Sequence, residues 1–237
     1  TIITRFPPAP NGYPHIGHAK AAIISEEYAK MYGGKIILRY EDTNPGTERL
    51  EYYAAIKVGM DWLGIQFDKI EHVSDNLENL YENAEKLIKS NDAYVCICKQ
   101  DTISKNRREM IECECTRRSI EENEQMWHEM FGEKKFKEGD ALLRFRGDMK
   151  SGNTTMRDPT LFRINTKRHA RAELKYRVWP TYDFAGIIFD SNAGVTHAMR
   201  SKEFELRKEL HHNILDKLGM EKSEFIFFGR LDLEGMP

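Results

Sequence analysis

The first 89 residues of the sequence alternate between strand-like and helix-like patterns of apolar side chains. Short β-branched and aromatic runs, typical of buried strands, occur at 1–6, in "KIILRYED" and near 70–73. Apolar residues recur at helical spacing over 17–32, 48–63 and 75–89. Strands and helices in this order and at these intervals predict a parallel sheet with crossover helices. The sequence therefore predicts an α/β fold.

The composition is that of an ordinary globular protein. Hydrophobic residues make up 40% of the 237 positions and charged residues 31%, which argues against a disordered or membrane-spanning class. The apolar runs fall short of the roughly 20 residues that a spanning helix needs. No basic and apolar signal segment is visible at the start. We therefore expect a cytoplasmic protein.

The pattern changes between 93 and 153. This part holds "AYVCICK", two polar helical stretches and a strand "ALLRFRG", which together look like an insertion of α+β character. Apolar runs then return with "VWPTYDFAGIIFD", a strand at 195–200, a helix opening at Ser201 as N-cap, and a last strand in "EFIFFGRL". We expect three parts, at 1–92, 93–153 and 154–237.

The stretch "FPPAPNGYPHIGHAKAA" places a Pro- and Gly-rich turn between the first strand and the first helix. A helix start offers free N–H groups and a positive dipole end, where phosphates bind. Gly12 and Gly17 let the backbone approach a ligand closely. His15 and His18, three residues apart, are expected on the same side of the first helical turn. The alternative is a structural turn with incidental histidines.

Four cysteines form two C-x-C pairs. In a strand, residues i and i+2 face the same side, so each pair offers two thiolates together. Two such pairs make a plausible tetrahedral structural zinc site, whose ligands are expected to be Cys96, Cys98, Cys113 and Cys115. In a cytoplasmic protein a metal is favoured over disulfides, and free buried cysteines are the alternative.

Five stretches, in order along the whole chain, resemble the class I aminoacyl-tRNA synthetases of the glutaminyl and archaeal or eukaryotic glutamyl type. They are "TRFPPAPNGYPHIGHAK", "LRYEDTNP", "MRDPTLFRI", "WPTYDFA" and "GVTHAMRSKEF". The resemblance implies a Rossmann-type parallel catalytic domain, split by a smaller acceptor-binding insertion. Some glutamyl enzymes carry zinc in that insertion.

The resemblance also implies roles for individual residues. His15 and His18 match the catalytic pair that steadies the ATP phosphates through charge that develops in the transition state. The expected ATP-binding residues are Pro8, Asn11, His15, Gly17, His18 and Arg230. The expected glutamate-binding residues are Arg5, Glu41, Tyr182 and Arg200, with Glu41 paired to the α-ammonium group. Mg²⁺ is expected with ATP.

The resemblance implies that Arg200 distinguishes glutamate from glutamine. Glutaminyl enzymes typically carry a small uncharged residue at this position of "GVTHAMRSKEF". An arginine can hold a side-chain carboxylate with two parallel hydrogen bonds, and a buried arginine penalises an amide. We therefore expect glutamate as the substrate. The alternative is a surface ion pair of Arg200 at a helix start.

Three features depart from the family pattern. Ala9 replaces a glutamate of the glutaminyl enzymes, and Gly186 replaces a polar residue that many relatives carry. The lysine-bearing loop that completes phosphate stabilisation is expected just beyond "LDLEGMP", so we expect a fragment that is incomplete for catalysis.

The basic stretch in and after the insertion suggests an RNA contact. Between 134 and 171, 11 lysines and arginines stand against 4 acids, within a net charge of −2. Phosphate contacts with some stacking are expected from Arg144, Arg146, Arg157 and Arg163 near Phe136, Phe145 and Phe162. The alternative is a solvated basic surface.

Taken together, these patterns predict ATP-dependent ligation of L-glutamate to the acceptor end of its tRNA through a glutamyl adenylate. Three alternatives are open: a glutaminyl enzyme, an enzyme that glutamylates a modified tRNA base, and a non-catalytic tRNA-binding factor.

Overall fold

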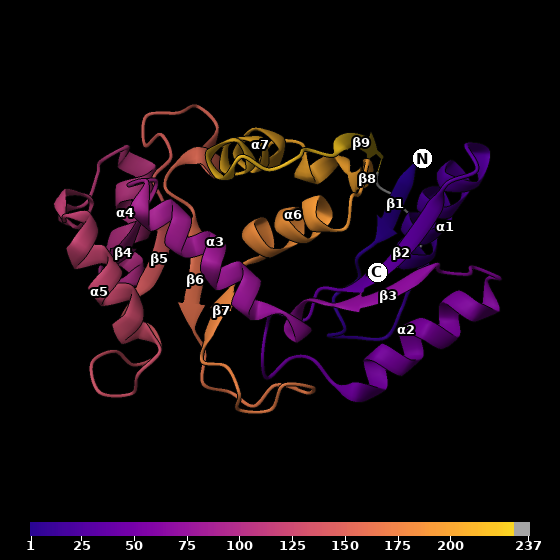
Figure 1. Ribbon diagram of the computed structural model, residues 1–237, viewed down its shortest axis with the longest axis horizontal. Helices are drawn as coiled ribbons and strands as arrows, with labels where there is room; N and C mark the ends of the chain where they lie inside the picture. The colour runs from indigo at the N-terminus through magenta and orange to yellow at the C-terminus, as the bar shows by residue number, and fades with distance from the viewer. Residues whose placement is uncertain (230–237) are drawn as a thin grey trace, which may run out of the picture.

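The computed structural model describes residues 1–229 (Figure 1). Its first layer is a parallel sheet of the strands β1 (Ile3–Phe6), β2 (Lys35–Tyr40) and β3 (Lys69–His72). The crossover helices are α1 (Ile16–Met31) and α2 (Leu50–Trp62). Helix α1 ends before Gly33, whose positive φ of 60° suits glycine. The predicted α/β fold is confirmed.

The end of the described chain returns to this layer. Strand β8 (His197–Ser201) pairs in parallel with β9 (Glu224–Phe228). The N–H of Thr196 donates to the carbonyl of Ile3 at 2.9 Å, and the N–H of Ile3 donates to Oγ1 of Thr196 at 2.9 Å. These bonds place β8 beside β1, so residues almost 200 positions apart meet at the start of the chain.

A second, antiparallel sheet has the order β4 (Ala93–Cys96), β5 (Leu142–Phe145), β6 (Thr160–Ile164) and β7 (Val178–Pro180). The helices around it are α3 (Leu77–Lys89), α4 (Gln100–Glu109) and α5 (Ile120–Met130). Because β5 pairs with β6, the sheet runs across the expected boundary between residues 153 and 154. The three-part division stays a prediction.

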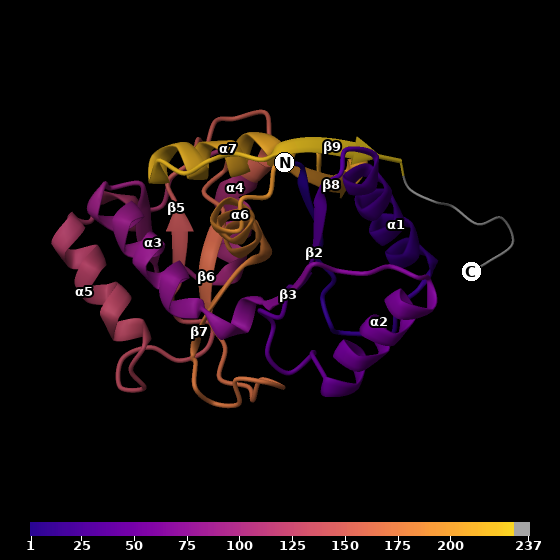
Figure 2. The same cartoon turned by 45° about the vertical axis from the view of Figure 1, so that its right-hand side comes forward.

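Helices α6 (Tyr182–Asn192) and α7 (Arg207–Leu218) lie between the two sheets in both views (Figures 1 and 2). Phe184 of α6 packs edge-to-face on Phe162 of β6. On its other side, the carbonyl of Gly186 accepts a hydrogen bond from Arg39 of β2 at 3.3 Å. Helix α6 therefore joins the antiparallel sheet to the parallel one.

Ser201 is the last residue of β8, paired with Phe228, and it is also the N-cap of a short 3₁₀ helix, Lys202–Phe204, as the capping pattern predicted. Its side chain makes no capping hydrogen bond, and helix α7 begins only at Arg207. One other expectation was wrong. Phe136, Phe145 and Phe162 do not stack on RNA bases, because all three are buried in the core around the antiparallel sheet.

Candidate active site

A cleft of about 670 Å³ lies where β1 ends, α1 begins and β8 meets α6. Seven of the residues expected from the sequence line it: Arg5, Pro8, His15, Gly17, His18, Tyr182 and Arg200. They come from segments that are far apart along the chain. The cleft therefore combines the histidines of the first helix start with the predicted specificity arginine.

His15 and His18 cap helix α1 and face each other, with ring centroids 4.0 Å apart. The N–H of Gly17 donates to Nδ1 of His15 at 3.1 Å, and the N–H of His15 donates to Nδ1 of His18 at 3.2 Å. Each neutral ring then carries its proton on Nε2, which can donate to a ligand. Burial lowers the pKa of His18, and the neighbouring His15 lowers it further.

Gly17 makes this capping arrangement possible. A Cβ at that position would lie 2.8 Å from Cε1 of His15, so any side chain would displace the ring. The bare backbone leaves the His15 imidazole at the helix start, where the positive end of the dipole also lies. The arrangement suits an anionic group such as a phosphate.

Three buried arginines converge on Asp190 of α6. Nε of Arg5 lies 3.0 Å from Oδ1 of Asp190, and Nη1 of Arg39 lies 2.6 Å from the same oxygen. Nη2 of Arg200 lies 3.5 Å from Oδ2. Burial alone would raise the pKa of Asp190, but the guanidinium groups of Arg5, Arg39 and Arg200 prevail and hold it at about 2. Asp190 is therefore ionised near neutral pH.

Arg200 lies deep in the cleft and is only 4% exposed. Its Nη1 donates to the hydroxyl of Tyr182 at 2.8 Å, and its guanidinium carbon lies 4.4 Å from the ring centroid of Phe225. Its Nε has no hydrogen-bond partner among the described residues. The alternative of a surface ion pair is therefore wrong, and a donor is left for a ligand.

Glu41 follows β2 and lies beside α6. Burial raises the pKa of its carboxyl to about 7, against the opposing effect of Arg39 and Arg5. A Cβ at position 186 would lie 2.9 Å from Oε1 of Glu41. Gly186, which departs from the family pattern, therefore leaves the space that the Glu41 carboxylate occupies.

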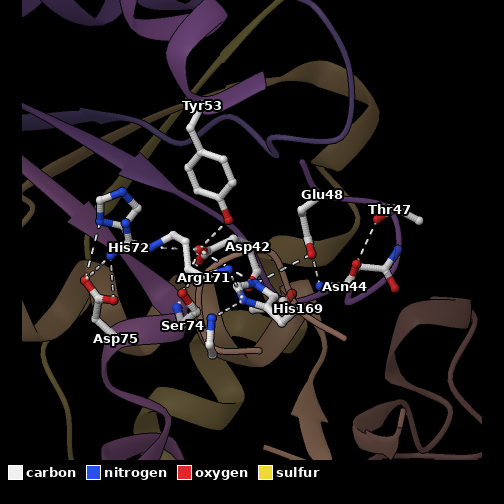
Figure 3. A network of polar contacts seen from close by, with 12 residues as sticks. Asp42, Asn44, Thr47, Glu48, Tyr53, His72, Ser74, Asp75, His169 and Arg171 are labelled. Carbon is white, nitrogen blue, oxygen red and sulfur yellow. Dashed lines mark hydrogen bonds and ion pairs between the residues drawn. The ribbon is translucent and has the colours of Figure 1, made fainter. Parts of the chain in front are cut away.

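The next residue, Asp42, is anchored in a buried polar network (Figure 3). Its Oδ2 accepts hydrogen bonds from the hydroxyl of Tyr53 at 2.8 Å and from Oγ of Ser74 at 2.7 Å. Its Oδ1 accepts from the N–H of Ser74 at 2.9 Å. Three donors satisfy this carboxylate, so the backbone next to Glu41 is tied to α2 and to the segment after β3.

His169 closes the same network from the loop between β6 and β7. Its Nδ1 accepts hydrogen bonds from the N–H groups of Arg171 at 3.1 Å and Ala172 at 2.9 Å. The proton of the neutral ring is therefore on Nε2, which donates to the carbonyl of Asp42 at 3.1 Å. The network fixes the backbone on which Glu41 is carried.

Two expected ATP-binding residues are not among those that line the cleft. Asn11 is exposed in the turn before α1, and its ATP contact stays a prediction. Arg230 lies outside the described residues. Conversely, Arg39 and Asp190 were not predicted from the sequence. The sequence did carry a signal for both residues, because each is a charged residue inside an apolar run. The runs are "KIILRY" for Arg39 and "GIIFDSN" for Asp190.

The four cysteines come together at the end of β4. The Sγ atoms of Cys96 and Cys113 are 4.0 Å apart, and those of Cys98 and Cys115 are 3.8 Å apart. All four sulfur atoms lie within 4.8 Å of one another. Tetrahedral zinc with bonds of about 2.3 Å requires sulfur atoms about 3.8 Å apart. The cluster therefore fits a tetrathiolate zinc ion.

Asp190→Asn tests the arginine cluster. The substitution keeps the shape but removes the anion shared by buried cations, so we expect a loss of about 3–5 kcal/mol in the free energy of unfolding in urea. Asp75→Asn is the control, because its ion pair with Arg171 is at the surface and is worth less than about 1 kcal/mol. Equal losses in the two variants would contradict this account.

Comparisons with known proteins show the family of the chain. The family described as "tRNA synthetases class I (E and Q), catalytic domain" matches residues 1–235. Over 236 residues, the chain is 58% identical to a glutamate–tRNA ligase of Cenarchaeum symbiosum and 59% identical to one of Nitrosopumilus maritimus. Both matches cover 100% of this chain, but 42% and 41% of those proteins. The chain thus spans about two fifths of these relatives.

Solved structures share the fold. A glutamate tRNA ligase from Elizabethkingia meningosepticum, in complex with its amino acid, matches with a TM-score of 0.72 at 19% identity, over 96% of this chain and 49% of that chain. A methionyl-tRNA synthetase from Mycobacterium tuberculosis matches with a TM-score of 0.56 at 12% identity, over 96% of this chain and 56% of that one. Because the family match extends over nearly every residue, this chain belongs to the catalytic domains of class I tRNA synthetases of the E and Q group.

Proposed function

We propose that the protein to which this chain belongs activates L-glutamate with ATP and transfers it to the 3′ end of a glutamate tRNA. The observation that carries the proposal is Arg200, a buried guanidinium in the cleft with an Nε donor that has no partner among the described residues. The names of the relatives, glutamate–tRNA ligases, support it. A cytoplasmic location follows from this role in translation.

The positive charge of Arg200 would recognise the side chain of the amino acid. The Arg200 guanidinium can pair with a γ-carboxylate, while a glutamine amide would turn its NH₂ group toward a cation or leave the Nε donor of Arg200 without a partner. Such a mismatch in a buried site costs a few kcal/mol, roughly a hundredfold or more in selectivity. This argues against the glutaminyl alternative.

The α-ammonium group would pair with Glu41. The carboxyl must be ionised for this charge-assisted hydrogen bond, and a bound ammonium group would itself lower its raised pKa. Arg5 and Tyr182 complete the pocket. Arg5 is held by Asp190 and by the carbonyl of Met199, at 3.0 Å from Nη1. Together, Glu41, Arg5 and Tyr182 would hold the amino acid in one orientation.

Activation needs no side-chain nucleophile. The carboxylate of the amino acid attacks the α-phosphorus of ATP, pyrophosphate leaves, and a hydroxyl of the tRNA 3′ end later displaces AMP from the adenylate. His15, His18 and the start of α1 would stabilise the charge that develops on the phosphate oxygens. Mg²⁺ bound with ATP would supply further neutralisation of the phosphate charge. Holding the attacking carboxylate in line with the leaving pyrophosphate would supply much of the remaining rate acceleration.

We propose that the basic stretch at 134–171 contacts the tRNA acceptor end. Fewer of its residues are available for this contact than the sequence suggested. Arg144 and Arg157 are buried and hydrogen-bond within the protein, which leaves them unsuited to phosphate contacts. Lys134, Lys135 and Lys137, by contrast, are exposed in the loop before β5. Exposed lysines of this kind suit electrostatic contact with a nucleic-acid backbone.

We also propose that Cys96, Cys98, Cys113 and Cys115 hold a structural zinc ion. Their sulfur separations fit a tetrahedral ion, and three of the four side chains are buried. None of the cysteines is among the residues that line the cleft. The zinc ion would therefore stabilise the fold of this region rather than take part in the reaction.

The glutamate assignment is tested by calorimetric titration of this chain with glutamyl- and glutaminyl-sulfamoyl adenosine. We expect the glutamyl mimic to bind roughly a hundredfold more tightly, and Arg200→Cys to remove most of that preference. Lys202→Cys is the matched control, because it removes the same charge from an exposed neighbouring residue. Equal binding of both mimics to the parent chain would refute the assignment.

The zinc assignment is tested by metal analysis of the purified chain. We expect about one zinc ion per chain, lost in Cys115→Ser because a structural site needs all four ligands. Thr116→Ser, a change at the adjacent residue, should keep its zinc. The glutamyl mimic should still bind the zinc-free protein if it stays folded. A parent chain that binds no zinc would refute this part of the proposal.

A further inference from the structure

Arg144 of β5 is a buried cation with an unusual set of neighbours. It is 1% exposed and one of the largest fully buried side chains. Its Nε donates to the carbonyl of Asp158 at 2.8 Å. Its Nη2 has no hydrogen-bond partner among the described residues. This leaves Nη1, which contacts sulfur.

The sulfur contacts of Arg144 involve two of the four cysteines. Its Nη1 lies 3.8 Å from Sγ of Cys96 and 3.9 Å from Sγ of Cys113. These separations are those of N–H···S hydrogen bonds. A guanidinium group is always charged, so these sulfur atoms are placed directly against a positive charge.

Arg144 makes no direct ion pair with a carboxylate among the described residues, although the Asp158 carboxylate attracts its charge from farther away. Within residues 1–229, no acidic oxygen lies within 4.0 Å of the Arg144 guanidinium. Asp158 is the acid beside it, but the oxygens of Asp158 accept hydrogen bonds from the hydroxyl of Tyr94 at 2.8 Å and the N–H of Gly147 at 2.9 Å. A buried cation without a close anion is expensive, at several kcal/mol.

Neutral thiols would leave the charge of Arg144 without a close anion, whereas a negatively charged metal-bound cluster would supply one. Four thiolates around Zn²⁺ carry a net charge of two minus. We propose that Arg144 is the positioning residue of the four-cysteine centre: it donates hydrogen bonds to Cys96 and Cys113 and offsets the negative charge of the tetrathiolate. The inference rests on the proposed zinc ion and assigns a role that the four ligands alone do not reveal.

Arg146, which directly follows β5, shows that a neighbouring arginine need not contact the sulfur atoms. Its guanidinium carbon lies 5.2 Å from the ring centroid of Tyr94, while that of Arg144 lies 5.6 Å from it. Arg146, however, donates to the carbonyls of Asn91 at 2.9 Å and Thr116 at 3.0 Å. It makes no contact with sulfur among its hydrogen bonds, which makes it a matched control.

The contacts of Arg144 also connect the cysteines to the turn of "MRDP". Arg144 bonds to the backbone of Asp158, whose carboxylate holds Tyr94, and the Tyr94 hydroxyl lies 3.9 Å from Sγ of Cys113. Outer contacts of this type orient metal ligands, and their loss typically weakens metal binding 10–100-fold.

The test is the zinc affinity of the parent chain, Arg144→Met and Arg146→Met, measured by competition with a chromophoric chelator. We expect Arg144→Met to bind zinc about 10–100-fold more weakly and Arg146→Met to bind it like the parent. With Co²⁺ in place of zinc, the thiolate-to-metal charge-transfer band should shift in Arg144→Met only. Equal zinc affinity in all three proteins, with unchanged Co²⁺ spectra, would overturn the role of Arg144.

Two milder variants cover the case in which Arg144→Met does not fold. Arg144→Lys keeps the charge, and Arg144→Gln keeps an N–H donor without the charge. Because charge balance is the core of the proposal, the lysine variant should bind zinc more tightly than the glutamine variant. The reverse order would overturn it. A parent chain without zinc affinity would instead refute the zinc proposal itself, while the glutamate assignment would stand.

Discussion

Asp190 is the buried carboxylate that holds the polar part of the cleft together. It forms ion pairs with Arg5 of β1, Arg39 of β2 and Arg200 of β8, and so connects three strands of the parallel layer to helix α6. Burying these cations is costly, and one carboxylate offsets only part of the cost. Nη2 of Arg39 and Nε of Arg200 stay without partners among the described residues. Of the two, only Arg200 lines the cleft, where a ligand that brings a carboxylate could pair with it.

The cleft and the four-cysteine centre follow the same physical rule at two places in the fold. In each, a buried arginine has donors that the protein does not fully satisfy: Arg200 in the cleft and Arg144 beside the cysteines. In each, the proposed ligand supplies the missing negative charge, as a side-chain carboxylate or as a tetrathiolate. Asp42 shows the contrasting case, because three donors within the protein satisfy its carboxylate.

Local patterns in the sequence predicted the parallel layer, the helix start that carries His15 and His18, and the cysteine pairs, because each depends on neighbours a few residues apart. What they could not predict depends on distant pairing. Arg39 and Asp190 are 151 positions apart, and the spacing of apolar residues carries no information about such a contact. The pairing of β5 with β6 across residue 153 and the extension of β8 to Ser201 were missed for the same reason.

Charged side chains in and beside the cleft are expected to pair with the charged groups of an amino acid, and proton release on binding tests this pairing most directly. The glutamyl adenylate mimic would be titrated calorimetrically at pH 6 in buffers of different ionisation enthalpy. With a pKa of about 7, Glu41 is mostly protonated there and must ionise to pair with the ammonium group. We expect release of nearly one proton by the parent chain, and none by Glu41→Gln. Binding without proton release, or equal release by both proteins, would contradict the account.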